Sequence, residues 1–466
     1  FSANSGQFIA PFPANVGSYN DIIASVSGYN SAVYAGTNTA ASTSGTYMLM
    51  HLFNTKLNNF NNFFNDFNLS KKWDNVKVNA GLYKGVQNIS MSWLWNSYLQ
   101  EVSDNNARMI DVKNASGQSL SPNGLLAYGV PAWGNCCTRN YDTKYDVTAP
   151  YAQIEVNAID KLSLDFGARY DIGNVTGSFA GGNGQTSAID MNGNGTIDPN
   201  EQKVATVGNN ITPVNYDYNI FGYSVGANYA INDKNAVFAR ISKGGSASAD
   251  RILFSGYNYT NTDDKALDAV KVNEVKQMEG GYKLRGAGYY LNTIVFYANT
   301  IEANYEATTQ KKTENNYKSV GVELDGYYRF NKTFEVRGGL TYTNAEIKDA
   351  IDKTIVGNTP RRTPKLMYNL NPNVNLGKVS TGFYLIGSSK AFAQDNNKLT
   401  MPAYMLVNPY LSYQFTKNLG ASINGNNIFD AIGVTEAEEG SIPANGIVRG
   451  RPLTGRSLSM SIKFDF

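Results

Sequence analysis

Residues 317–347 read YKSVGVELDGYYRFNKTFEVRGGLTYTNAEI. From Val320 to Phe330, mostly apolar residues alternate with polar or small ones, and a second alternating run, 334–347, follows a short polar turn. Successive side chains of a β-strand point to opposite faces of a sheet, so each run predicts a strand with one apolar and one polar face. The same period recurs from about residue 63 to the end of the chain, with almost no helical spacing. We therefore predict an all-β fold.

The connections between these strands alternate between short and long. Short polar turns are expected near residues 74–75, 159–161, 231–234, 286–287, 331–332, 377–378 and 416–418. Long connections are expected near 89–148, 174–216, 245–272, 301–315, 348–363, 390–402 and 428–454. Tight turns at one end of every hairpin and long loops at the other are typical of outer-membrane β-barrels.

Strand length also favours a membrane barrel. Runs such as 334–347 and 404–415 contain about a dozen residues, whereas strands of soluble sheets average ~5–6 residues. A tilted strand needs ~9–11 residues to cross the hydrocarbon core. A soluble sandwich or propeller, whose strands also alternate, is the less favoured alternative. We predict a transmembrane antiparallel β-barrel with long extracellular loops.

The C-terminus fits this prediction. In residues 457–466, apolar Leu458, Met460 and Ile462 alternate with polar residues, and the last residue is Phe466. This stretch resembles the C-terminal strand by which bacterial outer-membrane barrels are recognised for insertion. The alternative is an ordinary amphipathic edge strand.

Several stretches resemble the barrel of a TonB-dependent outer-membrane transporter. Asn427-Ile428-Phe429-Asp430 resembles the Asn-Leu-Phe-Asp motif of that family, and Arg449-Gly450-Arg451-Pro452 leads into the final strand as it does there. Further similar stretches are 54–103, 274–297, 317–345 and 360–364, so the resemblance covers roughly residues 54–466. It implies an integral protein of the outer membrane of a Gram-negative bacterium, embedded in outer-membrane lipid.

The resemblance also implies a function. In this family, ligand binds at the extracellular loops and at an N-terminal plug, and the TonB energy-transducing complex rearranges the plug so that ligand passes through the lumen. The ligand would be bulky: a ferric siderophore, a cobalamin or an oligosaccharide. The alternative is a passive outer-membrane porin with fewer strands.

One part of the family pattern is not recognisable in this sequence, namely the plug and the energy-coupling box before the barrel. Fifteen strands can be counted after residue 62, whereas a closed barrel of this type needs an even number, ~22. We expect a C-terminal barrel portion of a longer receptor, with residues 63–466 forming the barrel. Residues 1–62 are expected to be mostly an extracellular loop with possible partial strands, such as 47–52. A complete smaller porin is the alternative.

The sharpest local motif is DMNGNGTIDPNE at residues 190–201, which matches D-x-[DN]-x-[DN]-G-x5-E. In such a loop, oxygens at fixed positions surround Ca²⁺, and a glycine permits the sharp turn. The predicted ligands are Asp190, Asn192, Asn194, Thr196 through its carbonyl, Asp198 and Glu201. Only three of these groups are negative, which suits the modest affinity of an extracellular calcium site that stabilises a loop. The alternative is an Asn- and Gly-rich loop that turns without an ion.

Two further features lie in expected loops. Cys136 and Cys137 are adjacent, and on an oxidising outer face they predict a vicinal disulfide or inert thiols rather than a metal site. Trp133 and Tyr257 are candidate aromatic residues for stacking on a ligand.

Composition excludes other classes of protein. The chain has 466 residues and a formal net charge of +2, without the basic excess of a nucleic-acid-binding protein. Its single histidine, His51, excludes catalysis by a histidine pair and a metal site built on histidines. No run reaches the ~18 apolar residues of a membrane helix. We expect no enzymatic activity.

Overall fold

The computed structural model describes residues 2–4, 7–103, 106–129, 139–207, 211–248, 252–253, 256–260, 265–306, 311–437, 442, 446, 448 and 450–465. Within this part of the chain, 19 strands join into one antiparallel sheet. Its long strands are β2 (Gln7–Ser18), β4 (Thr46–Lys72), β5 (Val76–Glu101), β8 (Arg139–Ile159), β9 (Leu162–Ser187), β11 (Thr212–Asn232), β12 (Asn235–Ala247), β13 (Val272–Gly286), β14 (Tyr289–Glu306), β15 (Lys311–Arg329), β16 (Phe334–Ala350), β17 (Leu366–Leu376), β18 (Val379–Ser388), β21 (Tyr404–Gln414), β22 (Leu419–Asn426) and β25 (Ser457–Phe464).

The remaining elements are short. The large sheet also holds β1 (Ser2–Asn4), β7 (Leu125–Ala127) and β10 (Val204–Val207). Three two-stranded sheets pair β3 (Ser31–Tyr34) with β6 (Ile110–Lys113), β19 (Ala391–Phe392) with β20 (Thr400–Met401), and β23 (Val434–Ala437) with β24 (Gly450–Pro452). The helical turns are α1 (Tyr19–Ile22), α2 (Lys265–Asp268), η1 (Pro122–Gly124), η3 (Pro199–Glu201) and η5 (Lys353–Ile355). No helix in the described residues is long and apolar enough to span a bilayer.

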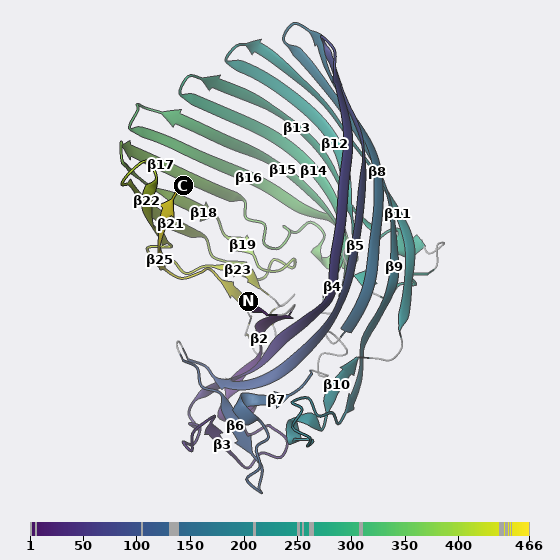
Figure 1. Cartoon of the computed structure of the whole chain (residues 1–466), viewed down its shortest axis with the longest axis vertical. Helices are drawn as coiled ribbons and strands as arrows, with labels where there is room; N and C mark the ends of the chain where they lie inside the picture. Colours follow the sequence, from purple (N-terminus) through teal and green to yellow (C-terminus); the bar gives the residue numbers. More distant parts are fainter. Residues whose placement is uncertain are drawn as a thin grey trace.

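Long strands that are neighbours in sequence pair as antiparallel hairpins, and the sheet curves from β4 round to β25 (Figure 1). β2 pairs with residues 46–56 of β4, so residues 57–72 pair on one side only, with β5. At the other edge, β25 pairs with β22 and with no other described strand. The predicted all-β fold is confirmed, and the fifteen strands counted after residue 62 correspond to β4 and the fourteen long strands that follow it.

Several strands are longer than predicted. The strand predicted to begin near residue 63 is β4, which begins at Thr46, so the expected boundary between residues 62 and 63 falls inside a strand. The run NTKLNNFNN at 54–62 is expected to be a loop because Asn has low β propensity. Its ladder with β5 overrides that local preference, with one bulge between Leu57 and Asn59. β5 and β9 have 26 residues each, far beyond the ~9–11 that cross hydrocarbon, so the connections after them are shorter than expected.

The two faces of the sheet differ in chemistry. One row of register partners across six neighbouring strands consists of Phe166, Val225, Ile241, Met278, Tyr297 and Val320. All six are exposed apolar side chains. One residue away, on the opposite face, Arg240 Nη2 lies 3.3 Å from Asp165 Oδ2. An exposed apolar row and a charged opposite face are the arrangement of a barrel whose outside contacts lipid and whose inside is polar.

Candidate functional site

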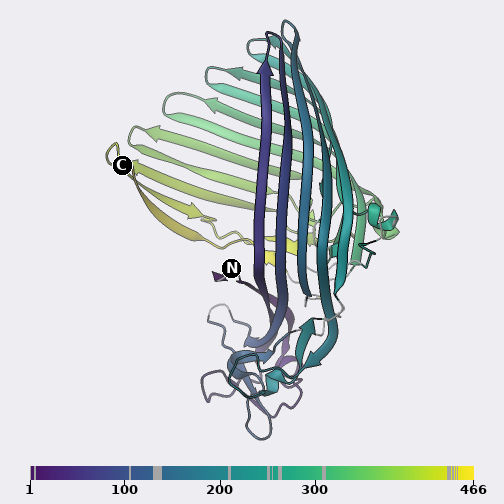
Figure 2. The same cartoon turned by 45° about the vertical axis from the view of Figure 1, so that its right-hand side comes forward.

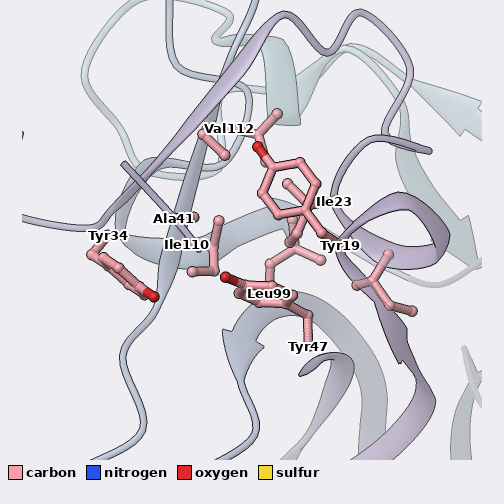
Figure 3. Close-up of a cluster of buried hydrophobic side chains, with 10 residues drawn as sticks. Tyr19, Ile23, Tyr34, Ala41, Tyr47, Leu99, Ile110 and Val112 are labelled. Atoms are coloured by element: carbon pink, nitrogen blue, oxygen red, sulfur yellow. The ribbon is translucent and has the colours of Figure 1, made fainter. Parts of the chain in front are cut away.

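The end of the sheet with long connections carries a compact unit that we call the loop module, formed by the described residues of 19–47 and 99–127. It projects beyond β4 and β5, away from the short turns (Figure 2). Its core contains Tyr19, Ile22, Ile23, Ala32, Tyr34, Ala41, Tyr47, Leu99, Ile110 and Val112. Figure 3 shows these side chains converging from the two connections. Two loops far apart in the sequence thus form one packed body.

Buried tyrosines hold this core together. Tyr47 is fully buried, and its hydroxyl donates to the carbonyl of Ser42 at 2.7 Å. The rings of Tyr19 and Tyr47 meet edge to face, with centroids 5.8 Å apart. Burial raises the pKa of Tyr19 to about 12, so its hydroxyl stays protonated and can share a hydrogen bond with that of Tyr29 at 2.9 Å.

A charged cluster lies at the junction between the loop module and the sheet. Arg108 donates from Nε and Nη2 to the two carboxylate oxygens of Glu101, at 2.8 and 2.9 Å. The guanidinium also lies 3.4 Å from the centroid of the Tyr34 ring. The hydrogen bonds from Arg108 lower the pKa of Glu101. The bidentate ion pair orients Arg108, and its cation–π contact with Tyr34 links the connection after β5 to the connection after β2.

The predicted calcium loop, residues 190–201, is folded around its own carboxylates. Asp190 accepts hydrogen bonds from the backbone of Gly193, Asn194 and Gly195, between 2.7 and 3.2 Å. Asp198 Oδ2 accepts from the amide nitrogens of Asn192 and Asn194, each at 3.0 Å. Gly195 has a φ of +82°, a conformation that favours glycine. The spacing of the motif therefore produces the curled backbone that it predicts.

Glu201, the last predicted ligand, anchors the loop. Its side chain is fully buried. Oε1 accepts from the backbone nitrogens of Met191 and Asn192, at 3.0 and 3.1 Å, and Oε2 accepts from that of Asp198 at 3.0 Å. A buried carboxylate held by neutral donors alone is a position where a cation would be favourable.

The donor set fits calcium in chemistry, because carboxylate, amide and carbonyl oxygens are the ligands of that ion. The carbonyl of Thr196 is a predicted ligand, and the N–H and hydroxyl of this residue both donate to Asn194 Oδ1 at 2.8 Å. No group of three or more His, Cys, Asp or Glu within the described residues is close enough to hold a metal by itself. The loop would therefore need its asparagine and carbonyl oxygens as well.

The predicted calcium loop packs against the loop module. Asn200 Nδ2 donates to the carbonyl of Leu125 at 3.4 Å, and the N–H of Ala205 donates to the carbonyl of Tyr128 at 3.2 Å. Three connections, those after β2, β5 and β9, therefore meet at one place.

The described residues of a fourth connection, between β12 and β13, lie against the polar face of the sheet. Along β11 the alternate residues Val214, Tyr216, Tyr218 and Ile220 are buried, whereas Phe221 and Tyr223 of the other face are exposed. Buried residues of this connection complete the cluster: Ile252, Leu253, Tyr259, Leu267 and Val270. In a barrel with a polar interior, this connection lies inside the mouth of the lumen.

Tyr257, one of the two candidate ligand-stacking aromatics, belongs to this connection and is half-buried. Its hydroxyl donates to Glu314 Oε1 at 2.9 Å, and Lys312 Nζ lies 4.1 Å from its ring centroid. The structure thus gives Tyr257 contacts with β15. Trp133, Cys136 and Cys137 lie outside the described residues.

Sequence reasoning missed an arginine network that joins the last three long connections. Glu436 pairs with Arg362 Nη1 at 2.5 Å and with Arg451 Nη1 at 2.9 Å. Arg362 also donates to the carbonyl of Ala437 at 2.8 Å, and Asp395 accepts from the N–H of Arg361 at 2.8 Å. The adjacent arginines were visible in the sequence, but their partners lie in connections that only the fold brings together.

Comparison with known proteins assigns this architecture. Residues 5–428 match the family described as TonB dependent receptor-like, beta-barrel. The rhizobactin receptor of Rhizobium meliloti (strain 1021) is 28% identical over 228 residues, which cover 45% of this chain and 28% of that protein.

Solved structures agree in fold. The ferric yersiniabactin uptake receptor of Yersinia pestis matches with a TM-score of 0.55 and 14% identity, over 92% of this chain and 60% of that one. The ferric preacinetobactin receptor of Acinetobacter baumannii matches with a TM-score of 0.57 and 13% identity, over 93% and 58%. The chain thus spans less than two thirds of the length of these relatives.

Proposed function

Because this chain belongs to the TonB-dependent receptor β-barrel family, we propose that it is the barrel portion of an outer-membrane receptor that imports a ferric siderophore with energy delivered through TonB. The family consists of outer-membrane receptors and transporters rather than enzymes, in agreement with the inference from the single histidine. The observation that carries the proposal is the family match across residues 5–428.

Among the three expected ligand classes, the relatives favour a siderophore. The similar proteins are described as receptors for rhizobactin, ferric yersiniabactin and ferric preacinetobactin. The loop module, the calcium loop and the connection at 248–271 gather on the side where such a receptor would meet its ligand. Energised import is favoured over a passive porin because the chain belongs to the family of TonB-dependent receptors.

The test is iron uptake. The complete gene containing this sequence is expressed in a bacterium that lacks its own siderophore receptors, and uptake of radioactive iron is measured with rhizobactin, yersiniabactin, preacinetobactin or citrate as the carrier. We expect saturable uptake with at least one carrier, and its loss when the host's TonB is deleted. Uptake that persists without TonB, together with ion conductance in a planar bilayer, would support the porin instead.

We also propose that residues 190–201 bind Ca²⁺ and thereby hold the junction of three connections. The support is the complete motif, the curled backbone and the buried Glu201. Calorimetric titration of the purified chain with calcium chloride should give binding in the ~10⁻⁴–10⁻³ M range of extracellular modules. Glu201→Gln should abolish it, and Asp142→Asn, which changes an exposed carboxylate outside the loop, should leave it intact. If the two variants bound calcium equally well, residues 190–201 would not be the calcium site.

A further inference from the structure

A concavity of the polar face lies at the opposite end of the molecule from the loop module. It has a volume of about 1120 Å³ and is lined by residues around four short turns. Its cationic side chains are Lys161, Lys234, Lys283, Arg285 and Arg329. Its carboxylates are Asp233 and Asp325, so the formal charge is +3. We call this concavity the basic cradle.

Most of this positive charge is not neutralised locally. Arg329 lies 3.5 Å from Glu335 Oε2. Lys161, Lys234 and Arg285, by contrast, have no ion-pair partner among the described residues. Lys283 Nζ lies 4.5 Å from the centroid of the Phe238 ring, a contact that leaves its charge uncompensated. Clustered cations inside a low-dielectric wall focus a positive potential, which attracts an anionic occupant.

The cradle faces the interior of the barrel. Lys283 is the register partner of Asn292, whereas its neighbour Leu284 is the partner of Leu291 on the apolar face. On the same polar face the rings of Tyr290 and Tyr327 stack, with centroids 5.9 Å apart. The cradle therefore opens into the lumen near the short turns, which are periplasmic in barrels of this kind.

The distribution of charge sets the shape of the occupant. The cations extend from Lys161, in the turn before β9, across β11, β12, β13 and β14 to Arg329 at the end of β15. Six adjacent strands spaced by ~4.8 Å extend over ~24 Å. A compact anion reaches only one or two of these cations at a time. An extended polypeptide rises ~3.3 Å per residue, so roughly seven residues reach all of them.

The remaining lining groups suit a peptide backbone. Asn228, Asn232 and Asn292 line the same concavity, and each amide can both donate and accept hydrogen bonds, as a peptide group does. Three observations point to the same occupant: the cations from Lys161 to Arg329, the amide side chains and the position of the cradle in the lumen. We propose that the basic cradle binds an extended acidic polypeptide segment at the periplasmic end of the lumen.

The test is a binding measurement on the whole chain in detergent. The probe is a fluorescein-labelled peptide of about ten residues in which Glu and Ala alternate, and its anisotropy is followed during titration with protein. The triple variant Lys234→Gln, Lys283→Gln, Arg285→Gln should weaken binding at least about tenfold. The matched control Lys332→Gln, Lys378→Gln, Lys417→Gln removes the same charge from other short turns and should change affinity by less than about twofold.

Three comparators decide what the cradle recognises. A peptide of about four residues with the same alternation should bind at least about tenfold more weakly, because it spans only part of the row. At an equal concentration of negative charge, citrate should displace the labelled peptide poorly. A single-stranded oligonucleotide should also displace it poorly. Equal loss of affinity in the two triple variants would overturn the proposal. Tight binding of citrate would overturn it in favour of a small-anion site, and tight binding of the oligonucleotide would show non-specific polyanion attraction instead.

Discussion

The loop module and the wall of the sheet place apolar side chains in opposite surroundings. In the module, Ile23, Leu99 and Ile110 are at most 1% exposed. In the wall, Ile241 and Met278 are 44% and 57% exposed. The module behaves like a small soluble protein, whose apolar groups leave water by packing on one another. In barrels of this family the wall lies in the outer membrane, where hydrocarbon would cover the exposed apolar groups, so the same residue types would have two different partners in one chain.

The largest expected effect tests the packed side of this comparison. Leu99→Ala should destabilise the loop module by ~2–5 kcal/mol, because it leaves a cavity in a core where neighbours cannot fully collapse. The measurement is hydrogen exchange of the backbone amides in β3 and β6. Ile241→Ala in the wall is the control and should leave these amides unchanged. Equal protection in Leu99→Ala and the unmodified protein would mean that the module has no cooperative core.

The second prediction tests the lipid-facing side. Met278→Arg places a charge in the apolar row and should cost ~2–4 kcal/mol if the row lies near the bilayer midplane. Gln277→Arg, one residue away on the polar face, should change stability by less than ~0.5 kcal/mol. Both are measured by urea unfolding in phospholipid vesicles. If the two variants were equally stable, the apolar face would not contact lipid.

A smaller effect is expected from one hydroxyl in the module. Tyr47→Phe removes the hydrogen bond to the carbonyl of Ser42 and should cost ~0.5–1.5 kcal/mol, since the group is buried. Tyr297→Phe is the wall counterpart, with a ring that is 38% exposed, and should have no measurable effect. The loss of stability in Tyr47→Phe is measured as a faster rate of proteolysis within the loop module. If Tyr297→Phe destabilised the protein as much as Tyr47→Phe, the wall and the loop module would not differ in how they bury tyrosine hydroxyls.

The smallest effect concerns pH. The pKa of Glu101 is lowered from its ordinary value of 4.5 by hydrogen bonds from Arg108. A depressed carboxyl pKa stabilises the folded state above the unfolded-state value, and this contribution is lost as the pH falls through the folded-state value. Loosening of the module should therefore begin as the pH falls below about 4.5 and increase as the pH passes through the lowered pKa of Glu101, as followed by hydrogen exchange of β6. Glu101→Gln should flatten this dependence, and an unchanged profile would contradict it.

Local sequence predicted the strand ladder well. The hairpin of β15 and β16 could be read from alternation and one polar turn, because both strands and their partner residues are close in the sequence. The start of β4 could not be read in the same way. Its Asn-rich half has low β propensity, and it becomes a strand through pairing with β5 over the range 47–72.

The candidate sites show the same contrast between residues that are close in the sequence and residues that are far apart. The calcium loop, residues 190–201, was predictable in shape because every predicted ligand lies within twelve residues of the first. The contact of Arg108 with Tyr34 and the basic cradle from Lys161 to Arg329 were not predictable. The two ends of each group are far apart in the sequence, so no local pattern predicts that they meet.

The amino-acid sequence by itself determined that the chain forms amphipathic strands joined alternately by short and long connections, because a period of two is a property of each strand alone. Only the tertiary structure decided which connections pack together as the loop module and which cations line up across six strands. Those arrangements depend on register and curvature of the sheet, which are set by all of its strands at once.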